Sequence, residues 1–588
     1  MPRILDPHFK RALGFVRPYA WSLLPVVLFS LMGTGLSLVL PYLSKLLVDD
    51  ALGAQNFDAL LKIVGLFVGI TAASFLTNVL SGMRYTRVSA DILFDMRLDL
   101  YRHLQRLATR FYAKTPLGDV VSRINGDIGE IQRVTAEATL AWMGQLIALV
   151  GTVGMLIYLD MRLFVAGLIT LPPALFALLR YRRQLEARVR DLRERSADIG
   201  TFLIETIQGM KLVVASNAQG REVERFGRKN DTFVESLMSM RLLTYLSGGF
   251  PGLILSGGTA IVFLYGGARV IAGTITLGTF VAFMAYQMRL LSPVQGLMGL
   301  WANFATAKVS LGRVHEILDV APEVSERPDP VALPVVHGSV TFEGVTFTFG
   351  RGGSVLEDVS FQVGPGEILA VAGASGSGKS TIADLLARHF DPDAGCISLD
   401  GVDLKDISLT DLRRQIVTVN QEPFVFHASI AENILYARPE ASPNDVAEAA
   451  RAAGLDDFLS GLPQGLDTTV GERGLAMSAG ERQRIAIARA LLADPAILVL
   501  DEATAALDPA TQAEVIRGYE AAMRNRTTIL ISHRLELVER ADRVVVIEGS
   551  RVVQEGTPQE LREVRGAFLE LFGARADVRT AGHVKAPQ

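Results

Sequence analysis

The stretch Gly373-Ala374-Ser375-Gly376-Ser377-Gly378-Lys379-Ser380-Thr381 decides how the second half of this chain folds. It fits G-x-x-x-x-G-K-[ST], follows the apolar run EILAVAG and opens the helical run TIADLLARHF. A glycine-rich loop between a strand and a helix lets backbone N–H groups wrap phosphates, and its lysine adds a positive charge. The predicted nucleotide-binding residues of this loop are Gly373, Ser375, Gly376, Ser377, Gly378, Lys379, Ser380 and Thr381.

A second apolar strand, AILVLDEAT, ends in two acidic residues, Asp501 and Glu502. An acid at the end of a strand beside such a loop is placed to hold Mg2+, as is the Ser380 hydroxyl. We expect this role for Asp501. Glu502 lies one residue further along, where a general base would polarise the attacking water.

These two strands belong to an α/β domain that we predict over 338–573. The Pro-rich stretch APEVSERPDPVALPVVH, 321–337, precedes it and reads as a linker. Residues 574–588 read as a flexible tail. The predicted strands are Val340–Phe349, Ile368–Gly373, Ile497–Asp501, Thr528–Ser532 and Val544–Glu548.

The first part of the chain, 1–320, has a different character. The whole sequence of 588 residues is 49% hydrophobic and only 20% charged, and the apolar residues gather in blocks before position 305. About 20 apolar residues span a bilayer as a helix. Six blocks meet or approach that length, which predicts an α-helical membrane domain with long cytoplasmic extensions. The predicted spans are 19–43, 60–83, 138–159, 163–180, 246–271 and 277–304.

Charge in the connections sets the expected orientation. The residues before the first span and the segments 84–137 and 181–245 are rich in Arg, whereas 44–59, 160–162 and 272–276 carry few basic residues. Positive charge marks the cytoplasmic side, so both termini and the α/β domain are expected in the cytoplasm. Segments 84–137 and 181–245 also have helical periodicity, and spans two to five are expected to continue as long helices.

The sequence disfavours several other classes of protein. The first apolar run is too long for a cleavable signal peptide. The single cysteine, Cys396, excludes a disulfide framework, and the net charge of −4 gives no indication of nucleic-acid binding.

The run GERGLAMSAGERQRIAIARALL, between the two nucleotide strands, resembles the signature region of ATP-binding cassette (ABC) proteins. In that family the L-S-G-G-Q element precedes a helix and meets the ATP held by another cassette. Here it reads Met477-Ser478-Ala479-Gly480-Glu481, and a hydroxyl with backbone amides at a helix N-terminus suits an anion. The resemblance assigns Ser478, Ala479, Gly480, Glu481 and Asp508 to the partner's ATP.

Other family marks follow in order along the chain. By resemblance, Phe349 stacks on adenine and His533 holds the γ-phosphate and the water. Gln421 begins the segment that links the site to the membrane domain, and it joins Ser380 and Asp501 as a magnesium ligand. The implied catalytic residues are therefore Glu502, His533 and Gln421, with ATP and Mg2+ as cofactors.

The resemblance covers almost the whole chain. TTVGERG (468–474) and FYAKTPLGDVVSRINGD (111–127) are similar to segments of ABC exporters, and six spans followed by one cassette is their half-transporter layout. The chain is most similar to bacterial lipid-flippase and multidrug half-transporters. This implies an ATP-hydrolysing translocase that works as a dimer. A second copy is the first choice of partner, and a related half-transporter is the alternative.

Three departures from the family pattern concern the signature. Met477 replaces Leu, which is a mild change of side chain. Ala479 replaces Gly and adds a methyl group where the backbone must approach a phosphate. Glu481 replaces Gln and brings a negative charge near a triphosphate, unless the side chain turns away. Slower hydrolysis is the expected consequence.

The expected substrate is a small amphipathic molecule: a lipid, a glycolipid or a hydrophobic drug, moved across the bacterial cytoplasmic (inner) membrane. Arg289 is a charge inside the sixth predicted span, and an ionisable residue at membrane depth is a substrate-site candidate. Its alternative role is to pair with backbone carbonyls. A processed-peptide exporter and an exporter-shaped importer remain as alternative functions.

Overall fold

The computed structural model describes residues 11, 14–134, 139–333, 335–350, 353–471, 477–501 and 509–580. It divides into two compact units. The first comprises 1–105 and 116–320, and the second comprises 106–115 and 321–588. Residues 106–115, which the sequence placed inside the membrane domain, thus pack with the cassette.

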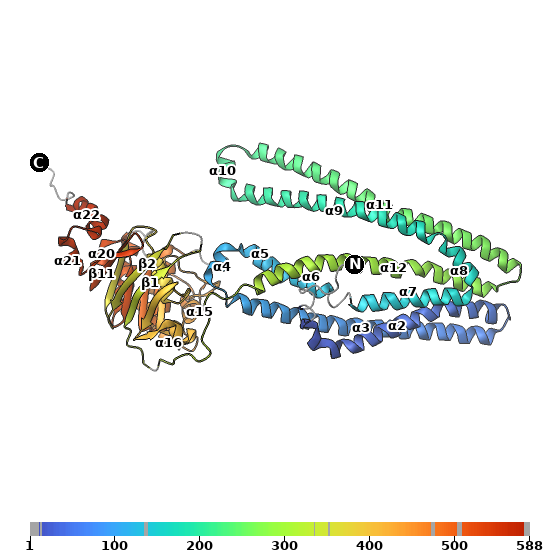
Figure 1. The fold of residues 1–588 in the computed structure, drawn as a ribbon, viewed down its shortest axis with the longest axis horizontal. Helices are drawn as coiled ribbons and strands as arrows, with labels where there is room; N and C mark the ends of the chain where they lie inside the picture. The colour runs from blue at the N-terminus through green and yellow to red at the C-terminus, as the bar shows by residue number, and fades with distance from the viewer. Residues whose placement is uncertain are drawn as a thin grey trace. The chain divides into compact units, whose positions relative to one another are not determined.

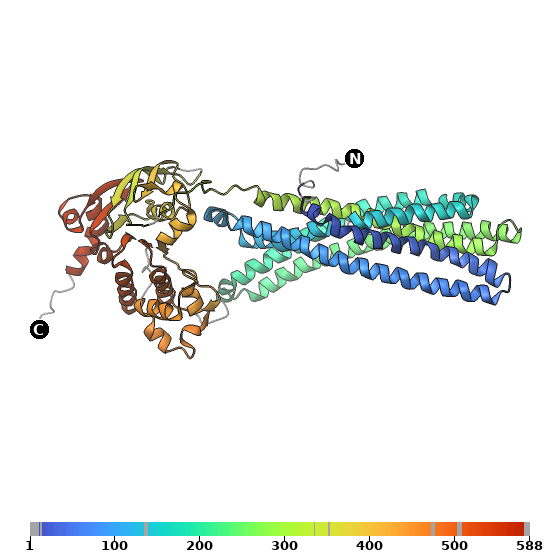
Figure 2. The same cartoon turned by 90° about the horizontal axis from the view of Figure 1, so that it is seen from below.

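Long helices build the first unit (Figure 1). Helices α2 and α3 pack along each other, α9 lies along α11, and α12 packs against α7 and α2 (Figures 1 and 2). Short helices connect several of them. The long helices are α2 (Ala20–Leu46), α3 (Phe57–Leu104), α7 (Thr139–Leu159), α8 (Met161–Leu168), α9 (Leu171–Gln208), α11 (Gln219–Ile271) and α12 (Leu277–Leu318). The short ones include α5 (Leu117–Ser122), α6 (Ile128–Gln132) and α10 (Met210–Ala215).

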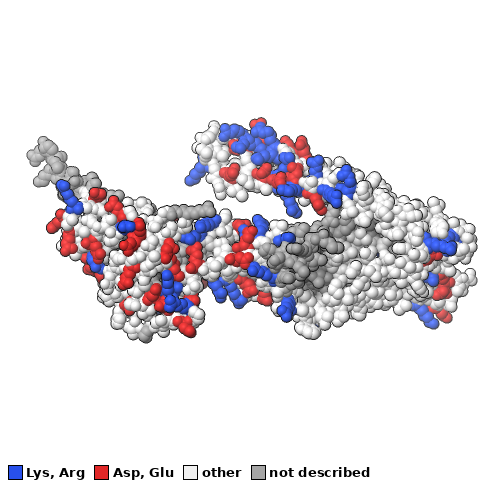
Figure 3. All heavy atoms as spheres, viewed as in Figure 1, with Lys and Arg blue, Asp and Glu red and all other residues white. Residues whose placement is uncertain are grey.

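Five helical stretches in the described part of the chain are long and apolar enough to cross a membrane: Gly14–Leu52, Phe57–Leu104, Trp142–Leu159, Met161–Gln208 and Gln219–Ile271. They contain the first, second, fourth and fifth predicted spans, and residues 142–159 of the third. The sixth predicted span is helical, within α12, but its crossing stays a prediction because that stretch does not reach the same apolarity. On the face shown in Figure 3, a broad band of the bundle is almost free of charged side chains.

The prolines of the predicted spans occupy two kinds of position. Pro25 and Pro41 lie inside α2, whereas Pro172 and Pro173 stand in the first turn of α9. A proline in the first turn removes a donor that has no intrahelical partner. The fourth predicted span is therefore two helices, α8 and α9, and α9 continues beyond the predicted span to Gln208.

The second unit is an α/β domain with two main sheets. The first has six strands in the order β12-β11-β3-β10-β9-β6, in which β11, β3, β10, β9 and β6 run parallel. The second is antiparallel, in the order β2-β1-β4-β5. The strands are β1 (Val340–Phe347), β2 (Leu356–Val363), β3 (Ile368–Gly373), β4 (Ala394–Leu399), β5 (Val402–Asp403), β6 (Ile416–Val419), β9 (Ile497–Asp501), β10 (Thr527–Ile531), β11 (Arg543–Glu548) and β12 (Arg551–Gly556); β7 (Ala428–Ser429) pairs with β8 (Thr469–Val470).

Three hydrophobic cores lie within the described part of this unit, and two of them position the nucleotide residues. One joins the antiparallel sheet to β3, β9 and α13 (Lys379–Leu386), and includes Phe342, Val371 and Ile382. The other gathers the helices that follow β6, among them α15 (Ile430–Leu435), α16 (Pro443–Ala452), α18 (Ala479–Ala493) and α19 (Pro509–Met523). The nucleotide loop and the signature helix α18 therefore belong to different cores.

The predicted linker is not a free tether. The Arg388 guanidinium donates to the Ser325 carbonyl at 3.0 Å, and the Leu409 amide donates to the Glu326 carboxylate at 2.6 Å. Further along, the Val331 amide donates to the Asp406 carbonyl at 2.7 Å. Proline prevents helix in this stretch, and the backbone it leaves extended is available to pair with the cassette.

The predicted tail also begins later than expected. The last helix, α22, covers Ala567–Thr580, so that 574–580 are helical. Residues 574–580 contain no Gly or Pro, and their Ala and Arg are good helix formers. Residues 581–588 lie outside the described part of the chain.

Candidate functional site

The loop after β3 has the geometry of a phosphate cradle. Gly376 and Gly378 have φ values of +82° and +100°, and Gly378 is the N-cap of α13. A Cβ on Gly378 would lie 2.7 Å from Leu356 and 2.8 Å from the Val355 carbonyl. Only glycine fits this position without strain, because both its backbone conformation and its surroundings exclude a side chain.

The side chains of the loop are suited to a triphosphate. The Lys379 ammonium donates to the carbonyls of Gly373 at 3.0 Å and Ala374 at 2.8 Å, and so is held within the loop. The Ser377 hydroxyl is buried and has no hydrogen-bond partner in the structure, a condition that a phosphate oxygen would relieve. Ser380 is exposed at the start of α13, as a magnesium ligand must be. These residues fit ATP with Mg2+.

The parallel sheet brings the other predicted residues to the same edge. β10 lies between β3 and β9, with Ile531 opposite Asp501 in the register. Because parallel strands share one carboxyl edge, Gly373, Asp501 and His533 all follow strand ends there. Gln421 comes two residues after the end of β6, the neighbour of β9, and is exposed. Glu502 and Asp508 lie outside the described residues.

Phe349, the predicted adenine platform, lies in the loop after β1, which ends at Phe347. Its ring is 42% exposed. It makes edge-to-face contacts with Phe347 and Phe390, at centroid distances of 4.9 and 5.5 Å. An exposed ring held at its edges is suited to stacking on a base.

The signature residues form the N-terminus of α18. Ser478 is the N-cap, its hydroxyl accepts from the Glu481 amide at 3.3 Å, and the Glu481 carboxylate accepts from the Ser478 amide at 2.7 Å. This is a capping box, and it turns Glu481 back onto its own helix end. Ala479 is exposed and Gly480 is buried. The carboxylate thus stays at the helix end that a phosphate would approach, and the repulsion expected from the sequence remains a prediction.

Arg289, the substrate candidate, has a structural partner. Its guanidinium donates to the Ser37 carbonyl at 2.7 Å. Pro41 lies four residues after Ser37 in α2 and lacks the N–H that would pair with this carbonyl. The side chain is nonetheless exposed and carries further donors. The carbonyl-pairing role therefore holds, and it leaves donors for a ligand.

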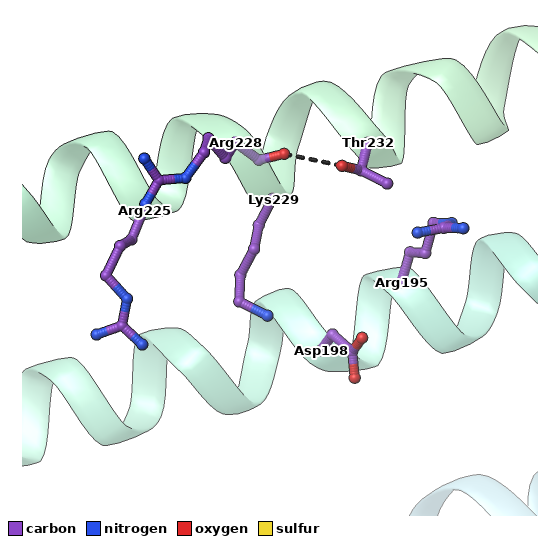
Figure 4. A pocket seen from close by; sticks show the side chains of 6 residues that line it. All are labelled: Arg195, Asp198, Arg225, Arg228, Lys229 and Thr232. Carbon is purple, nitrogen blue, oxygen red and sulfur yellow. Dashed lines mark hydrogen bonds between the residues drawn. The ribbon is translucent and has the colours of Figure 1, made fainter.

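A cavity of about 340 Å³ opens between the charged parts of α9 and α11 (Figure 4). Its basic side chains include Arg195, Arg225 and Arg228, and each of them pairs with a carboxylate: Asp191, Glu222 and Glu224, respectively. Each pair lies within one helix: Arg195–Asp191 in α9, and the other two in α11. The cavity is therefore lined by basic side chains that pair along their own helices.

One residue that bears on the nucleotide site was not singled out from sequence. Arg110 lies in α4 (Thr109–Lys114), within the segment that packs with the cassette. Its guanidinium carbon is 5.3 Å from the centre of the Phe349 ring. No local pattern signals this contact, because the two residues are far apart in the chain.

A phosphate loop, a signature helix and a bundle of apolar helices on one chain define a membrane transporter driven by ATP. Residues 23–294 match the family described as ABC transporter transmembrane region, and residues 356–505 match the family described as ABC transporter. The chain belongs to the ABC transporter family and combines the membrane region with the ATP-hydrolysing domain.

Several relatives match over nearly their full length. The chain is 34% identical to "Uncharacterized ABC transporter ATP-binding protein YknV" of Bacillus subtilis, over 96% of this chain and 94% of that protein. It is 33% identical to an "ATP-dependent lipid A-core flippase" of Syntrophus aciditrophicus, over 96% and 94%. A solved structure of a bacterial Atm1-family ABC exporter with ATP bound is similar, with a TM-score of 0.77 and 26% identity over 97% of this chain and 99% of that one.

Proposed function

We propose that this chain is one half of a homodimeric exporter that uses ATP to move or flip an amphipathic substrate across the bacterial cytoplasmic membrane. The observation that carries the proposal is the continuity of the long helices. α3, α9 and α11 run unbroken from apolar stretches into charged cytoplasmic stretches, on the same chain as the phosphate loop. A relative named as a lipid A-core flippase and another named as a "Putative multidrug export ATP-binding/permease protein" support this substrate class.

The dimer is implied by the family, in which the phosphate loop and the signature that meet one ATP belong to different cassettes. ATP held by the loop of one chain would meet Ser478 of a second chain, and two such sites would close together. Two exposed apolar surfaces also suit a second copy. One is the short helix α10, with Leu212 71% exposed; the other is the aromatic group Phe424, Phe426 and Tyr436, with Phe424 69% exposed. Exposed patches of this kind mark interaction sites.

Different residues of the cassette bind ATP and carry out its hydrolysis. Lys379 and the loop amides bind the phosphates, and Phe349 carries the adenine. Ser380, Gln421 and Asp501 would hold Mg2+, which neutralises charge on the phosphates when bound. Glu502 would accept a proton from the attacking water, and His533 would hold the γ-phosphate in place. ATP shifts the population of transporters towards the form in which the two cassettes are closed on each other. Only in that form do both cassettes contact the bound ATP.

On the membrane side, we assign Arg289 to an acidic group of the substrate. Its donors beyond the one used by Ser37 are free to meet a phosphate or carboxylate of a lipid headgroup. We place both termini and the cassette in the cytoplasm.

The first test is ATPase activity of the purified chain, alone, in lipid nanodiscs, beside Glu502→Gln. Activity that is lost in the variant while ATP binding persists would support a self-sufficient homodimer. Stimulation by lipids, glycolipids or hydrophobic drugs would then rank the substrates. A folded, ATP-binding chain without activity would overturn the homodimer and point to a second half-transporter.

Direction needs a separate measurement. Inside-out vesicles that take up a stimulating substrate only with ATP would support export. Uptake by right-side-out vesicles loaded with ATP would identify an importer, and stimulation by peptides alone would favour a peptide exporter.

A further inference from the structure

Within the segment 106–115, Ala108 packs against the cassette core and Arg110 contacts the aromatic rings near the nucleotide site. Its guanidinium carbon lies 5.3 Å from the centre of the Phe349 ring and 5.5 Å from that of Phe390. An arginine over an aromatic face is attracted by the ring quadrupole, more strongly as water is excluded. The Arg110 side chain is only 22% exposed.

Polar contacts fix the orientation of the same guanidinium. One terminal nitrogen donates to the Glu323 carboxylate at 3.4 Å, and the other donates to the Thr348 carbonyl at 3.5 Å. Thr348 precedes Phe349 in the chain, so Arg110 contacts both the ring and the backbone that carries it. Glu323 lies in the docked stretch before β1.

The position is not optimised for stability. The Nε of Arg110 is buried and has no hydrogen-bond partner in the structure. A buried donor without a partner is unfavourable, and such groups call for an explanation other than packing. An apolar side chain beside two phenylalanines would avoid that cost, so the presence of arginine here indicates a role beyond filling space.

We propose that Arg110 is a positioning residue for ATP. It holds the Phe349 ring in the orientation that receives adenine and so links ATP affinity to the segment that continues from the membrane helix α3. The inference rests on the proposed role of Phe349 in the ATP site. A ring already held in place loses less conformational freedom when the base stacks, and this difference appears as affinity. Displacement of 106–115 by α3 would release the ring and weaken ATP binding.

The test measures ATP affinity in Glu502→Gln protein in nanodiscs, where hydrolysis does not intervene. Arg110→Gln is expected to weaken ATP binding by between about twofold and thirtyfold, the range of one cation–π contact. Arg110→Lys keeps the charge and should recover part of the loss. Lys114→Gln is the matched control, since it removes one positive charge from an exposed position of the same helix and should leave affinity unchanged.

Two further readouts separate positioning from general damage. Inorganic tripolyphosphate lacks a base, so its affinity should be equal in the wild type and Arg110→Gln. In a Phe349→Leu background, Arg110→Gln should cause no additional loss, because the residue acts through the ring. Equal ATP affinity of Arg110→Gln and the wild type, a parallel loss for tripolyphosphate, or additive losses in the double variant would each overturn the proposal. Failure of the unmodified chain to bind ATP would instead overturn the proposed function.

Discussion

The Glu481 carboxylate accepts a hydrogen bond from the Ser478 amide at 2.7 Å, while the Ser478 hydroxyl accepts one from the Glu481 amide at 3.3 Å. Both groups of Ser478 that a phosphate would contact are therefore engaged by the residue that departs from the family pattern. Glutamine can form the same capping box without a charge.

Glu481→Gln should strengthen the ATP-dependent closure of the cassette pair. Across roughly 10 Å, a unit charge opposes a phosphate charge by about 0.4 to 1.7 kcal/mol, depending on the dielectric, or roughly two- to twentyfold in affinity. The measurement is the ATP concentration that gives half-maximal ATPase activity in nanodiscs. Glu481→Ala is the control: it removes the charge and also the capping-box bond to the Ser478 amide, while the Ser478 cap stays. A higher half-maximal concentration in Glu481→Gln would contradict the prediction.

Gly378→Ala should damage the nucleotide loop more than Gly376→Ala. Both positions have positive φ, which costs a residue with a side chain roughly 1–2 kcal/mol. Only at Gly378 would the added Cβ also collide with Leu356 and the Val355 carbonyl; at Gly376 it would meet nothing within 4 Å. Thermal unfolding and ATP binding of the two variants check the order. Equal losses would mean that the loop rearranges to admit the methyl group.

Arg289→Gln should destabilise the protein mainly through Pro41. Loss of a charged donor to an otherwise unpaired carbonyl costs about 1.5–3 kcal/mol. In a Pro41→Ala background the Ser37 carbonyl regains an intrahelical donor, so the same substitution should cost much less there. The melting temperatures of the wild type, Arg289→Gln, Pro41→Ala and the double variant measure the coupling between Arg289 and Pro41. Additive effects would rule out the relationship between Arg289 and Pro41.

The same variant also tests the substrate assignment. Arg289→Gln should reduce stimulation of the ATPase by anionic lipids, but not by neutral drugs, because only the anion uses the guanidinium charge. Unchanged stimulation by every anionic compound would remove Arg289 from the substrate site.

Acid should loosen the pairing of helices α9 and α11 through Asp191. Hydrogen bonds from Ser236, at 2.8 Å, and Arg195 hold the pKa of this carboxyl below its usual value. Because the pKa is lowered in the folded state, the stabilisation is present above the ordinary pKa and is lost as pH falls through the lowered one. Spin labels on the two helices should separate at a higher pH in Ser236→Ala than in the wild type. An identical pH profile would exclude this role.

Sequence patterns predicted the structural features that depend on residues close together in the chain. Five apolar stretches, the α/β domain and the strand–loop–helix of the nucleotide site all rest on runs or spacings within a few tens of residues. The break between α8 and α9 was not predicted, although Pro172 and Pro173 mark it, because prolines also occur within intact helices such as α2. Arg110 and the docked linker were missed because their partners are distant in the chain. The position of the Glu481 carboxylate depends on a side-chain rotamer, which composition does not specify.

The contacts of the stretch 321–337 with the cassette shorten the free chain between the end of α12 and the cassette. A flexible chain of 17 residues would average roughly 23 Å between its ends. Anchors at Glu323, Ser325, Glu326 and Val331 leave only 319–322 to bend. Extra residues inserted before Glu323 would lengthen the effective tether, whereas the same residues inserted after Val331 would form a surface bulge. The stretch therefore acts as a short joint with a fixed attachment point.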